Sequence, residues 1–114
     1  MTGYPYGLHG SIRAVPGKRD ALLELLLETA RTTPSMPGCR LYLVSTVPGD
    51  PDAVAVTEVW DDKAAHDTSL ALDRVRSVIA RARPFIAGIG ASSEFRPVGG
   101  LTPDGLLVSP DRSG

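Results

Sequence analysis

The sequence predicts a single α+β domain in which helices cover one face of an antiparallel sheet. Three observations support this prediction. Stretches of alternating apolar and polar residues, typical of strands, flank stretches in which apolar residues recur at helical spacing. Pro and Gly residues separate nearly all of these stretches and so mark them as distinct elements. The 114 residues, 42% of them hydrophobic and 22% charged, have the size and composition of one globular domain.

The chain begins with a predicted strand and a predicted helix. Apolar and polar side chains alternate over residues 7–15, which is the pattern of a strand. Pro16 and Gly17 end that strand. Residues 18–32 have a broad apolar face at helical spacing and are predicted to form a helix; this face consists of Leu22, Leu23, Leu26, Leu27 and Ala30. Pro34 and the pair Pro37–Gly38 follow this helix and end it.

Two more strands follow and are predicted to form an antiparallel hairpin. Residues 39–47, CRLYLVSTV, and residues 53–60, AVAVTEVW, are rich in β-branched and aromatic residues. The segment between them, Pro48–Gly49–Asp50–Pro51, has the composition of a turn. Two strands joined by so short a turn pair with each other in opposite directions.

The second half of the chain repeats the helix-and-strand pattern. A short helix is predicted from Asp62 to about Ser69, with Asp61 or Asp62 as its N-cap. Asp73 resembles the cap of a second helix, whose apolar residues are Val75, Val78, Ile79 and Ala82. Pro84 closes that helix. Residues 88–98 are predicted to form the last strand, interrupted by glycines and ending near Pro97.

The resulting order, β-α-β-β-α-β, is the split βαβ or ferredoxin-like arrangement. Residues 1–114 are expected to form one domain with a core of about residues 7–98 and a Gly/Pro-rich tail over residues 99–114. Apolar residues occur on both faces of the hairpin strands, although a sheet covered by helices on one face normally has a polar outer face. We therefore expect a homodimer built through the uncovered face. The apolar residues 106–108 of the tail are expected to cover the partner or a cavity mouth; the alternative is a disordered tail, because Gly and Pro dominate the residues around them.

Composition argues against several functions. The formal net charge is -1 and no cluster of Lys and Arg stands out, so we expect no binding to nucleic acid. No apolar run approaches the length of a membrane span, and the first ten residues do not resemble a signal peptide. Cys39 is the only cysteine, which is compatible with a reducing compartment. A cytoplasmic protein is the expectation.

The stretch TEVWDDKAAHD, residues 57–67, contains the candidate site. Trp60 ends a predicted strand on the same face as Glu58, and is either a core residue, a pocket wall that stacks on an aromatic ligand, or both. His66 lies on the short helix that follows. It is a candidate general base, because an imidazole titrates near pH 6.5, or it is a surface or capping residue. Its position shortly after Trp60 would let it overhang the sheet.

Glu58 is unusual because charged side chains are depleted in strand interiors. It could orient His66 or an arginine, or it could form an ion pair with Arg40 or Arg13 on a neighbouring strand. Tyr42 alternates with Arg40 on its strand and could donate a hydrogen bond into a cavity or pack at a seam. Cys39 is read as a small buried hydrophobe. The two His residues and the scattered carboxylates have no metal-ligand spacing, so no metal site is predicted.

Four segments, PGKRDALLELL, MPGCRLYLVS, TEVWDDKAAHDTSLA and IARARPFIAG, together resemble the antibiotic biosynthesis monooxygenase family, in particular the small bacterial proteins called quinol monooxygenases. The resemblance runs from about Leu8 to Val98. It implies a ferredoxin-like monomer that pairs sheet to sheet as a dimeric α+β barrel, and a small apolar cavity between sheet and helices. It also implies oxidation of quinols or polycyclic phenols by O₂ as co-substrate, with no flavin, haem or metal as cofactor.

The sequence departs from the family in one respect. Some catalytic members place an Asn near the reacting oxygen, and the haem-degrading branch combines Asn, Trp and His, whereas this chain contains no Asn. Haem degradation is therefore the less favoured activity. In the favoured hypothesis His66 and Glu58 are catalytic, and Trp60, Tyr42 and Arg40 bind a small aromatic or quinol-like ligand. The alternative is a dimeric module of the same fold that binds a small molecule or assembles without catalysis.

Overall fold

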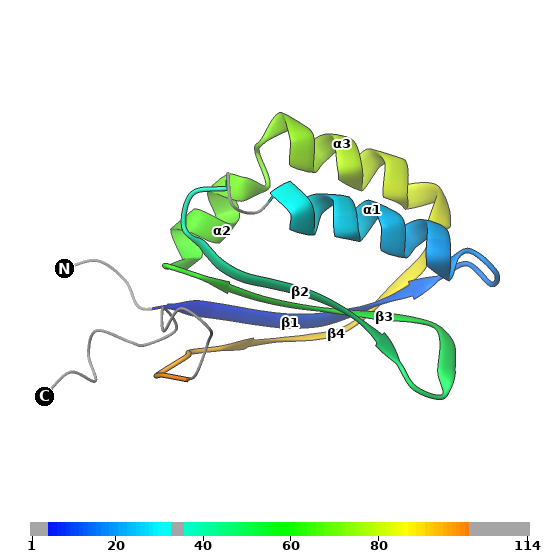
Figure 1. The fold of residues 1–114 in the computed structure, drawn as a ribbon, viewed down its shortest axis with the longest axis horizontal. Helices are drawn as coiled ribbons and strands as arrows, with labels where there is room; N and C mark the ends of the chain where they lie inside the picture. Colours follow the sequence, from blue (N-terminus) through cyan, green and yellow to red (C-terminus); the bar gives the residue numbers. More distant parts are fainter. Residues whose placement is uncertain (1–4, 33–35, 101–114) are drawn as a thin grey trace, which may run out of the picture.

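A computed structural model of the chain describes residues 5–32 and 36–100. In chain order its elements are β1 (Tyr6–Ala14), α1 (Arg19–Thr32), β2 (Cys39–Val47), β3 (Asp50–Trp60), α2 (Lys63–Ser69), α3 (Asp73–Ala82), a single 3₁₀ turn (Arg83–Phe85) and β4 (Ile86–Phe95). The strands form one antiparallel sheet in the order β2-β3-β1-β4. All three helices lie on the same face of this sheet (Figure 1). The predicted ferredoxin-like α+β fold is confirmed.

The β2–β3 hairpin is tighter than the sequence suggested. Strand β3 begins at Asp50 instead of residue 53, and Asp50 pairs with Val47, so only Pro48 and Gly49 remain in the turn. Gly49 has a φ of +83°, a backbone conformation that side chains disfavour and glycine adopts readily. This glycine allows the chain to reverse within two residues, and β3 is the longest strand of the sheet as a result.

The start of α2 agrees with the prediction and the start of α3 does not. Asp62 is the N-cap of α2, and its carboxylate accepts a hydrogen bond from the backbone N–H of Ala65 at 2.8 Å. Asp73 was expected to cap α3, but it is the first residue within that helix and Leu72 takes the cap position without a side-chain hydrogen bond. In the first turn Asp73 stabilises α3 through its charge, because the helix N-terminus is positive.

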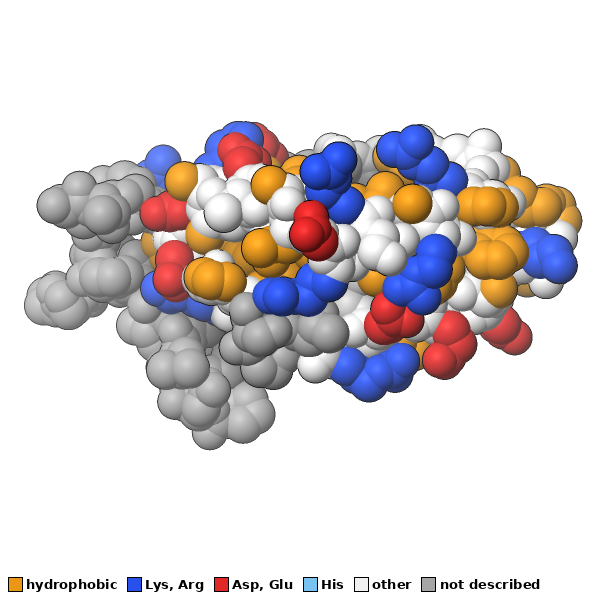
Figure 2. All heavy atoms as spheres, turned by 90° about the horizontal axis from the view of Figure 1, so that it is seen from above, with side chains coloured by type: hydrophobic (Ala, Val, Ile, Leu, Met, Phe, Trp, Pro, Cys, Tyr) orange, Lys and Arg blue, Asp and Glu red, His pale blue; other side chains and the backbone are white. Residues whose placement is uncertain are grey.

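The apolar residues between sheet and helices form two clusters. The larger joins Ala14, Val54 and Val56 of the sheet to Leu22 and Leu26 of α1. The smaller lies at the other end of the sheet and consists of Trp60, Met36 and Val75 with partly buried neighbours, among them Tyr6, Cys39, Ala65 and Leu72. An ion pair between Arg81 and Glu28 joins α3 to α1. Charged side chains of both signs are spread over the helix-covered surface, with hydrophobic side chains between them (Figure 2).

Among the described residues, no helix covers the other face of the sheet (Figure 1). Its side chains alternate with those of the core, and they include Leu41, Leu43 and Ala55 beside the polar His9 and Thr57. Leu43 is 51% exposed. The apolar content that the sequence placed on both faces of the hairpin is thus present. The apolar tail residues 106–108 lie outside the described residues. Within the described ranges, no helix is long and apolar enough to cross a membrane.

Candidate active site

A cavity of about 260 Å³ lies between the sheet and the three helices. It is small for a ligand site, since drug-sized molecules occupy pockets of about 300–1,000 Å³. Among the described residues that line it, only Thr29, Tyr42, Glu58 and His66 are polar, and the rest are apolar residues from β1, α1, α3 and β4 and from the segments beside them. An apolar space with a few convergent polar groups is the usual form of a small-molecule site.

Glu58 supplies the carboxyl group of the cavity. It lies on β3 directly between Leu8 of β1 and Tyr42 of β2, so its side chain points toward the helices. Trp60, two residues further on the same face, donates a hydrogen bond from Nε1 to Glu58 Oε1 at 3.1 Å. Burial raises the pKa of Glu58, and the hydrogen bond from Trp60 and the nearby His66 oppose that rise only in part. A carboxyl group in this setting binds a proton more readily than one at the surface.

His66 stands over the same end of the cavity. Its ring lies 5.3 Å from the Tyr6 ring, tilted by 46°, and 5.8 Å from the Trp60 ring in an edge-on arrangement. Its side chain is only 13% exposed. Aromatic contacts of this kind hold a ring in one orientation. The expected overhang of His66 above the sheet is present.

Asp67 holds one nitrogen of His66. Its Oδ1 lies 3.0 Å from His66 Nδ1, and Lys63 contacts the same carboxylate at 3.2 Å. The hydrogen bond with His66, followed by that with Lys63, lowers the pKa of Asp67, so the carboxylate is ionised and can only accept. The proton shared with the imidazole is therefore on Nδ1, and in the neutral ring Nε2 is the proton acceptor.

Tyr42 completes the polar end of the cavity. Burial, and then the negative charge of Glu58, raise the pKa of its hydroxyl group far above the ordinary value for tyrosine. The hydroxyl therefore keeps its proton and can serve as a hydrogen-bond donor to a ligand oxygen. Glu58, His66 and Tyr42, three of the residues singled out in the sequence, are thus brought together in one cavity.

The structure places the two other predicted ligand-binding residues elsewhere. Trp60 is buried in the smaller core cluster and is not among the lining residues; it contacts Glu58 and His66 from behind. Arg40 also lies off the cavity, with its Nε 2.7 Å from Asp61 Oδ1. The pairing of β2 with β3 shifts between Cys39 and Leu41, which breaks the expected alternation of Arg40 with Tyr42. Arg13 pairs with Asp50, so Glu58 has an indole partner in place of the expected arginine.

Sequence reasoning missed several residues of this site. Asp67 and Tyr6 hold the His66 ring, and Thr29 and Met36 line the cavity. Asp67 had a detectable signal, because a carboxylate next to a candidate base is a common orienting partner. Tyr6 had none, since it lies 60 residues before His66 and meets it only through the β1–β3 pairing, which places Tyr6 opposite Trp60.

The Cys39 thiol has little reactivity. Burial, and then the charge of Glu58, raise the pKa of the Cys39 thiol to about 11, so it is a weak nucleophile near neutral pH. In the described ranges no group of three or more His, Cys, Asp or Glu residues has the arrangement of a metal site.

This fold and this cavity define a class: a ferredoxin-like domain with a small apolar chamber whose ionisable groups gather at one end. Residues 5–81 match the model of the antibiotic biosynthesis monooxygenase family, and the chain belongs to that family. No curated protein matches the sequence.

Solved structures agree with this assignment. A candidate antibiotic biosynthesis monooxygenase from Chloroflexus aurantiacus is 49% identical; the match covers 86% of this chain and 97% of the other, with a TM-score of 0.80. One from Deinococcus radiodurans is 28% identical over 85% of this chain and 96% of the other, with a TM-score of 0.72. One from Caulobacter crescentus shares the fold with a TM-score of 0.74; it is 18% identical over 81% of this chain and 88% of the other.

Proposed function

We propose that this protein is a monooxygenase that oxidises a quinol or polyphenolic aromatic compound with O₂ and without a cofactor. The observation that carries the proposal is the gathering of Glu58, His66 and Tyr42 at one end of an otherwise apolar cavity. Membership of the antibiotic biosynthesis monooxygenase family supports the same reaction type. An aromatic ring suits the apolar walls, and its hydroxyl groups suit the polar end.

In this proposal His66 is the base that removes the phenolic proton. Asp67 accepts from Nδ1 and so leaves Nε2 to take the proton, while the contacts with Tyr6 and Trp60 fix the ring. Tyr42 keeps its proton and donates a hydrogen bond to a ligand oxygen. Burial raises the pKa of Glu58, so its carboxyl group takes up a proton more readily and, when it holds one, can donate a second hydrogen bond. A ligand that fills the apolar cavity displaces its water, so the phenolate that forms at the polar end is poorly solvated and electron-rich.

The redox chemistry takes place on the substrate and O₂. The phenolate passes one electron to O₂, and the resulting radical pair combines to form a carbon–oxygen bond and a hydroperoxide. The oxygen–oxygen bond then breaks, the distal oxygen leaves as water with the proton that the base had taken and a second substrate proton, and the ring is left as a hydroxyquinone. The substrate loses four electrons and O₂ gains four: hydroquinone plus O₂ gives hydroxyquinone plus water.

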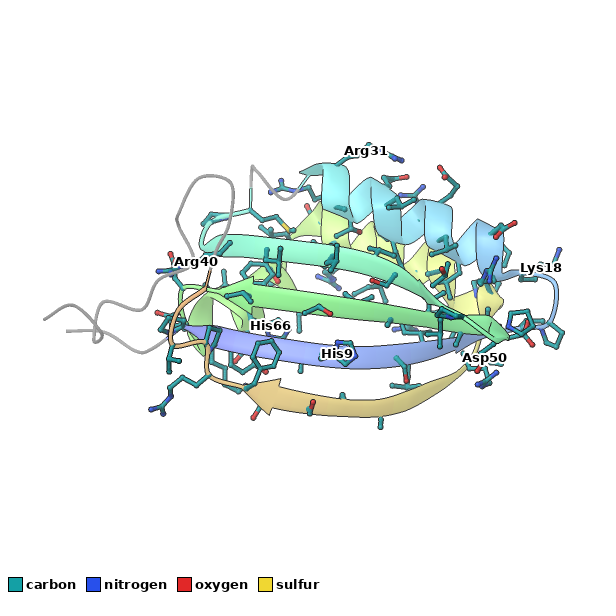
Figure 3. The ribbon with its side chains drawn as sticks, turned by 60° about the horizontal axis from the view of Figure 1, so that its bottom comes forward. His9, Lys18, Arg31, Arg40, Asp50 and His66 are labelled. Atoms are coloured by element: carbon teal, nitrogen blue, oxygen red, sulfur yellow. The ribbon has the colours of Figure 1, made fainter. Side chains whose placement is uncertain are left out.

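Oxygen uptake by the purified protein with a panel of hydroquinones tests this proposal. His66→Ala should lower turnover about 10²–10⁴-fold, the usual contribution of a positioned base. His9→Ala is the matched control, because His9 lies on the uncovered face of the sheet with Thr57 as its partner, as its place in Figure 3 also shows. A His66→Ala protein with full activity would remove the base assignment, and no uptake above the buffer rate with any hydroquinone would favour a non-catalytic binding module.

We also propose that the protein is a homodimer built through the uncovered face of the sheet. Leu43 is 51% exposed there, and a monomer would leave it and its apolar neighbours in water. An obligate dimer should bury more than about 2,000 Å² in total. Light scattering should therefore show a dimer for the wild type and a monomer for Leu43→Glu. Ala80→Glu, on the exposed surface of α3, is the control and should stay dimeric; a wild-type monomer at micromolar concentration would exclude the dimer.

A further inference from the structure

The polar and apolar residues of the cavity are separated along its length. Glu58 and Tyr42 face each other on one rung of the sheet, and His66 stands over the same end. Val54 lies four residues before Glu58 on β3, which is about 13 Å at the rise of an extended strand. It pairs with Ile12 of β1, which in turn pairs with Ile89 of β4. The second end of the cavity is therefore the end at Ile12, and it is apolar.

Helix α1 shows the same separation of polar and apolar residues along the cavity. It begins beyond the end of β1 at Ala14 and runs back toward Met36, so Leu22 lies at the Ile12 end of the cavity and Thr29 lies nearer the polar end. The lining residues at the Ile12 end thus come from β1, β4 and α1 and are apolar (Ile12, Ile89 and Leu22), whereas Thr29 of α1 lies nearer Glu58. No Lys or Arg is among the described lining residues. Within the described lining, no cationic side chain would pair with a negatively charged group.

The apolar end is open to solvent beside the edge of the sheet. Strand β4 is an edge strand, and its Ile89, which lines the cavity, is 72% exposed. Ile79 of α3 also lines the cavity and is 39% exposed, whereas the other large side chains that α3 exposes are polar. Single exposed apolar residues are common on proteins, but two of them at the rim of one cavity extend its apolar surface outward.

We propose that the ligand is an amphiphile: a phenolic or hydroquinone head with an uncharged alkyl or prenyl chain. The head lies among Tyr42, Glu58 and His66, and the chain follows Ile12 and leaves the cavity over Ile79 and Ile89. The proposal rests on the proposed function for the identity of the head group. A compact polyphenol without a chain would leave the apolar end and its isoleucine rim unfilled, and a chain that ends in a carboxylate would find no cation in the cavity.

A series of 4-alkylphenols, from methyl to heptyl, tests this proposal by isothermal titration calorimetry. These compounds bind through the same head and do not undergo the four-electron reaction, so binding is measured apart from turnover. Each buried methylene contributes about 0.8 kcal/mol, so Kd should fall by up to about fourfold per methylene until the chain emerges from the rim. A 4-alkylphenol whose chain ends in a carboxylate should bind more weakly than its uncharged counterpart.

Variants locate the chain. Ile79→Ser/Ile89→Ser should flatten the dependence of Kd on chain length and leave the affinity for 4-methylphenol unchanged. Val98→Ser is the matched control, because Val98 is an exposed apolar residue that is not among the described lining residues, and this variant should show the same dependence of Kd on chain length as the wild type. Ile89→Ser alone is a further variant with little risk to folding, since this side chain is largely in solvent. Circular dichroism confirms folding.

The outcomes separate this inference from the proposed function. A Kd that does not change with chain length in the wild type overturns the inference, even if short hydroquinones are oxidised. The same conclusion follows if the dependence persists in the double variant, or if the double variant changes the oligomeric state and not the chain-length dependence, because the two isoleucines then contact another protein surface. A steep dependence without oxygen uptake would support the amphiphilic ligand and end the monooxygenase proposal.

Discussion

The two ends of strand β3 each carry a carboxylate, Asp50 at its start and Glu58 near its finish, and the two groups have opposite environments. Asp50 lies on the surface, where Arg13 contacts both of its oxygens, at 2.7 and 3.3 Å. Glu58 lies in the cavity, and its hydrogen-bond donor is the uncharged indole of Trp60 at 3.1 Å. Asp50 lies at one end of the sheet, and Arg40 and His66 lie toward the opposite end (Figure 3).

The difference shows what separates a structural carboxylate from a candidate functional one on the same strand. The hydrogen bonds from Arg13 and from the backbone of Asp52 lower the pKa of Asp50, so it is ionised near neutral pH. Burial raises the pKa of Glu58, and a neutral donor cannot compensate as a guanidinium does. Because the donor to Glu58 is an indole and not a guanidinium, its carboxyl group binds a proton more readily than that of Asp50, and the proposed reaction uses the protonated group as a hydrogen-bond donor.

The largest expected effect concerns the residue that supports the Glu58 end. Trp60→Ala removes a buried side chain from the smaller core cluster and the hydrogen-bond donor of Glu58, and should lower the free energy of unfolding by roughly 3–5 kcal/mol. It should also weaken ligand binding, because His66 loses a contact that holds its ring. Urea unfolding followed by circular dichroism measures the first effect and calorimetry the second.

Two controls sharpen this prediction. Trp60→Phe keeps most of the volume and removes only the N–H donor, so it should cost less than Trp60→Ala. Pro51→Ala, at the exposed start of the same strand, should lower the free energy of unfolding by no more than about 1 kcal/mol, which is the effect of the greater freedom of the unfolded chain without proline. A Trp60→Ala protein as stable as the Pro51→Ala protein would show that the two ends of β3 are equally tolerant, contrary to the burial of Trp60.

The next effect is a pH dependence set by Glu58. Because its folded-state pKa is above the ordinary value of 4.5, the folded state holds a proton that the unfolded state has released, and stability falls as pH rises through this window. Glu58→Gln cannot ionise and can still accept from Trp60. The variant should therefore gain stability over the wild type as pH rises above about 4.5, and the gain should be absent in more acidic solution.

Urea unfolding of both proteins from pH 3.5 to 8 measures this difference. Activity gives a second readout: Glu58→Gln should retain the hydrogen bond to the ligand and so cost less turnover than His66→Ala. If the difference in stability does not depend on pH, Glu58 is not desolvated in the folded protein and its assignment to the cavity is wrong.

The fold was predictable because its signals are local. Alternation, helical spacing and the Pro and Gly residues between elements are properties of short segments, and they place every strand and helix within a few residues of the observed bounds. The cap at Asp62 follows from the same local chemistry. The shift in pairing at Arg40 is different in kind, because a bulge is defined by the partner strand and cannot be seen in one strand alone. It moved Arg40 away from the cavity, where alternation had placed it.

The site was predictable in its residues more than in their roles. Glu58 and His66 stood out as ionisable residues in unusual positions, and both line the cavity. Trp60 stood out equally but forms the support behind them, because large aromatic side chains both fill cores and line pockets, and only the packing of Met36 and Val75 decides between these uses. The cavity itself is the space that three helices and a sheet leave between them, and no single segment encodes it.

The smallest expected effect is at the start of β3. The folded-state pKa of Asp50 is below the ordinary value of 3.8, so its ionised form contributes stability that is present above that value and is lost as pH falls through the folded-state pKa. Asp50→Asn should therefore lower stability slightly at neutral pH and match the wild type in acid, which is the opposite slope from that of Glu58→Gln. The effect should shrink in 1 M salt because the pair with Arg13 is exposed, whereas the Glu58→Gln difference should persist, since salt screens buried groups much less. Parallel urea titrations of the two variants at two pH values and two salt concentrations measure both slopes. If the stability differences of the two variants from the wild type change with pH in the same direction, Asp50 and Glu58 have similar environments. The contrast between a paired surface carboxylate and a desolvated cavity carboxyl group would then be wrong.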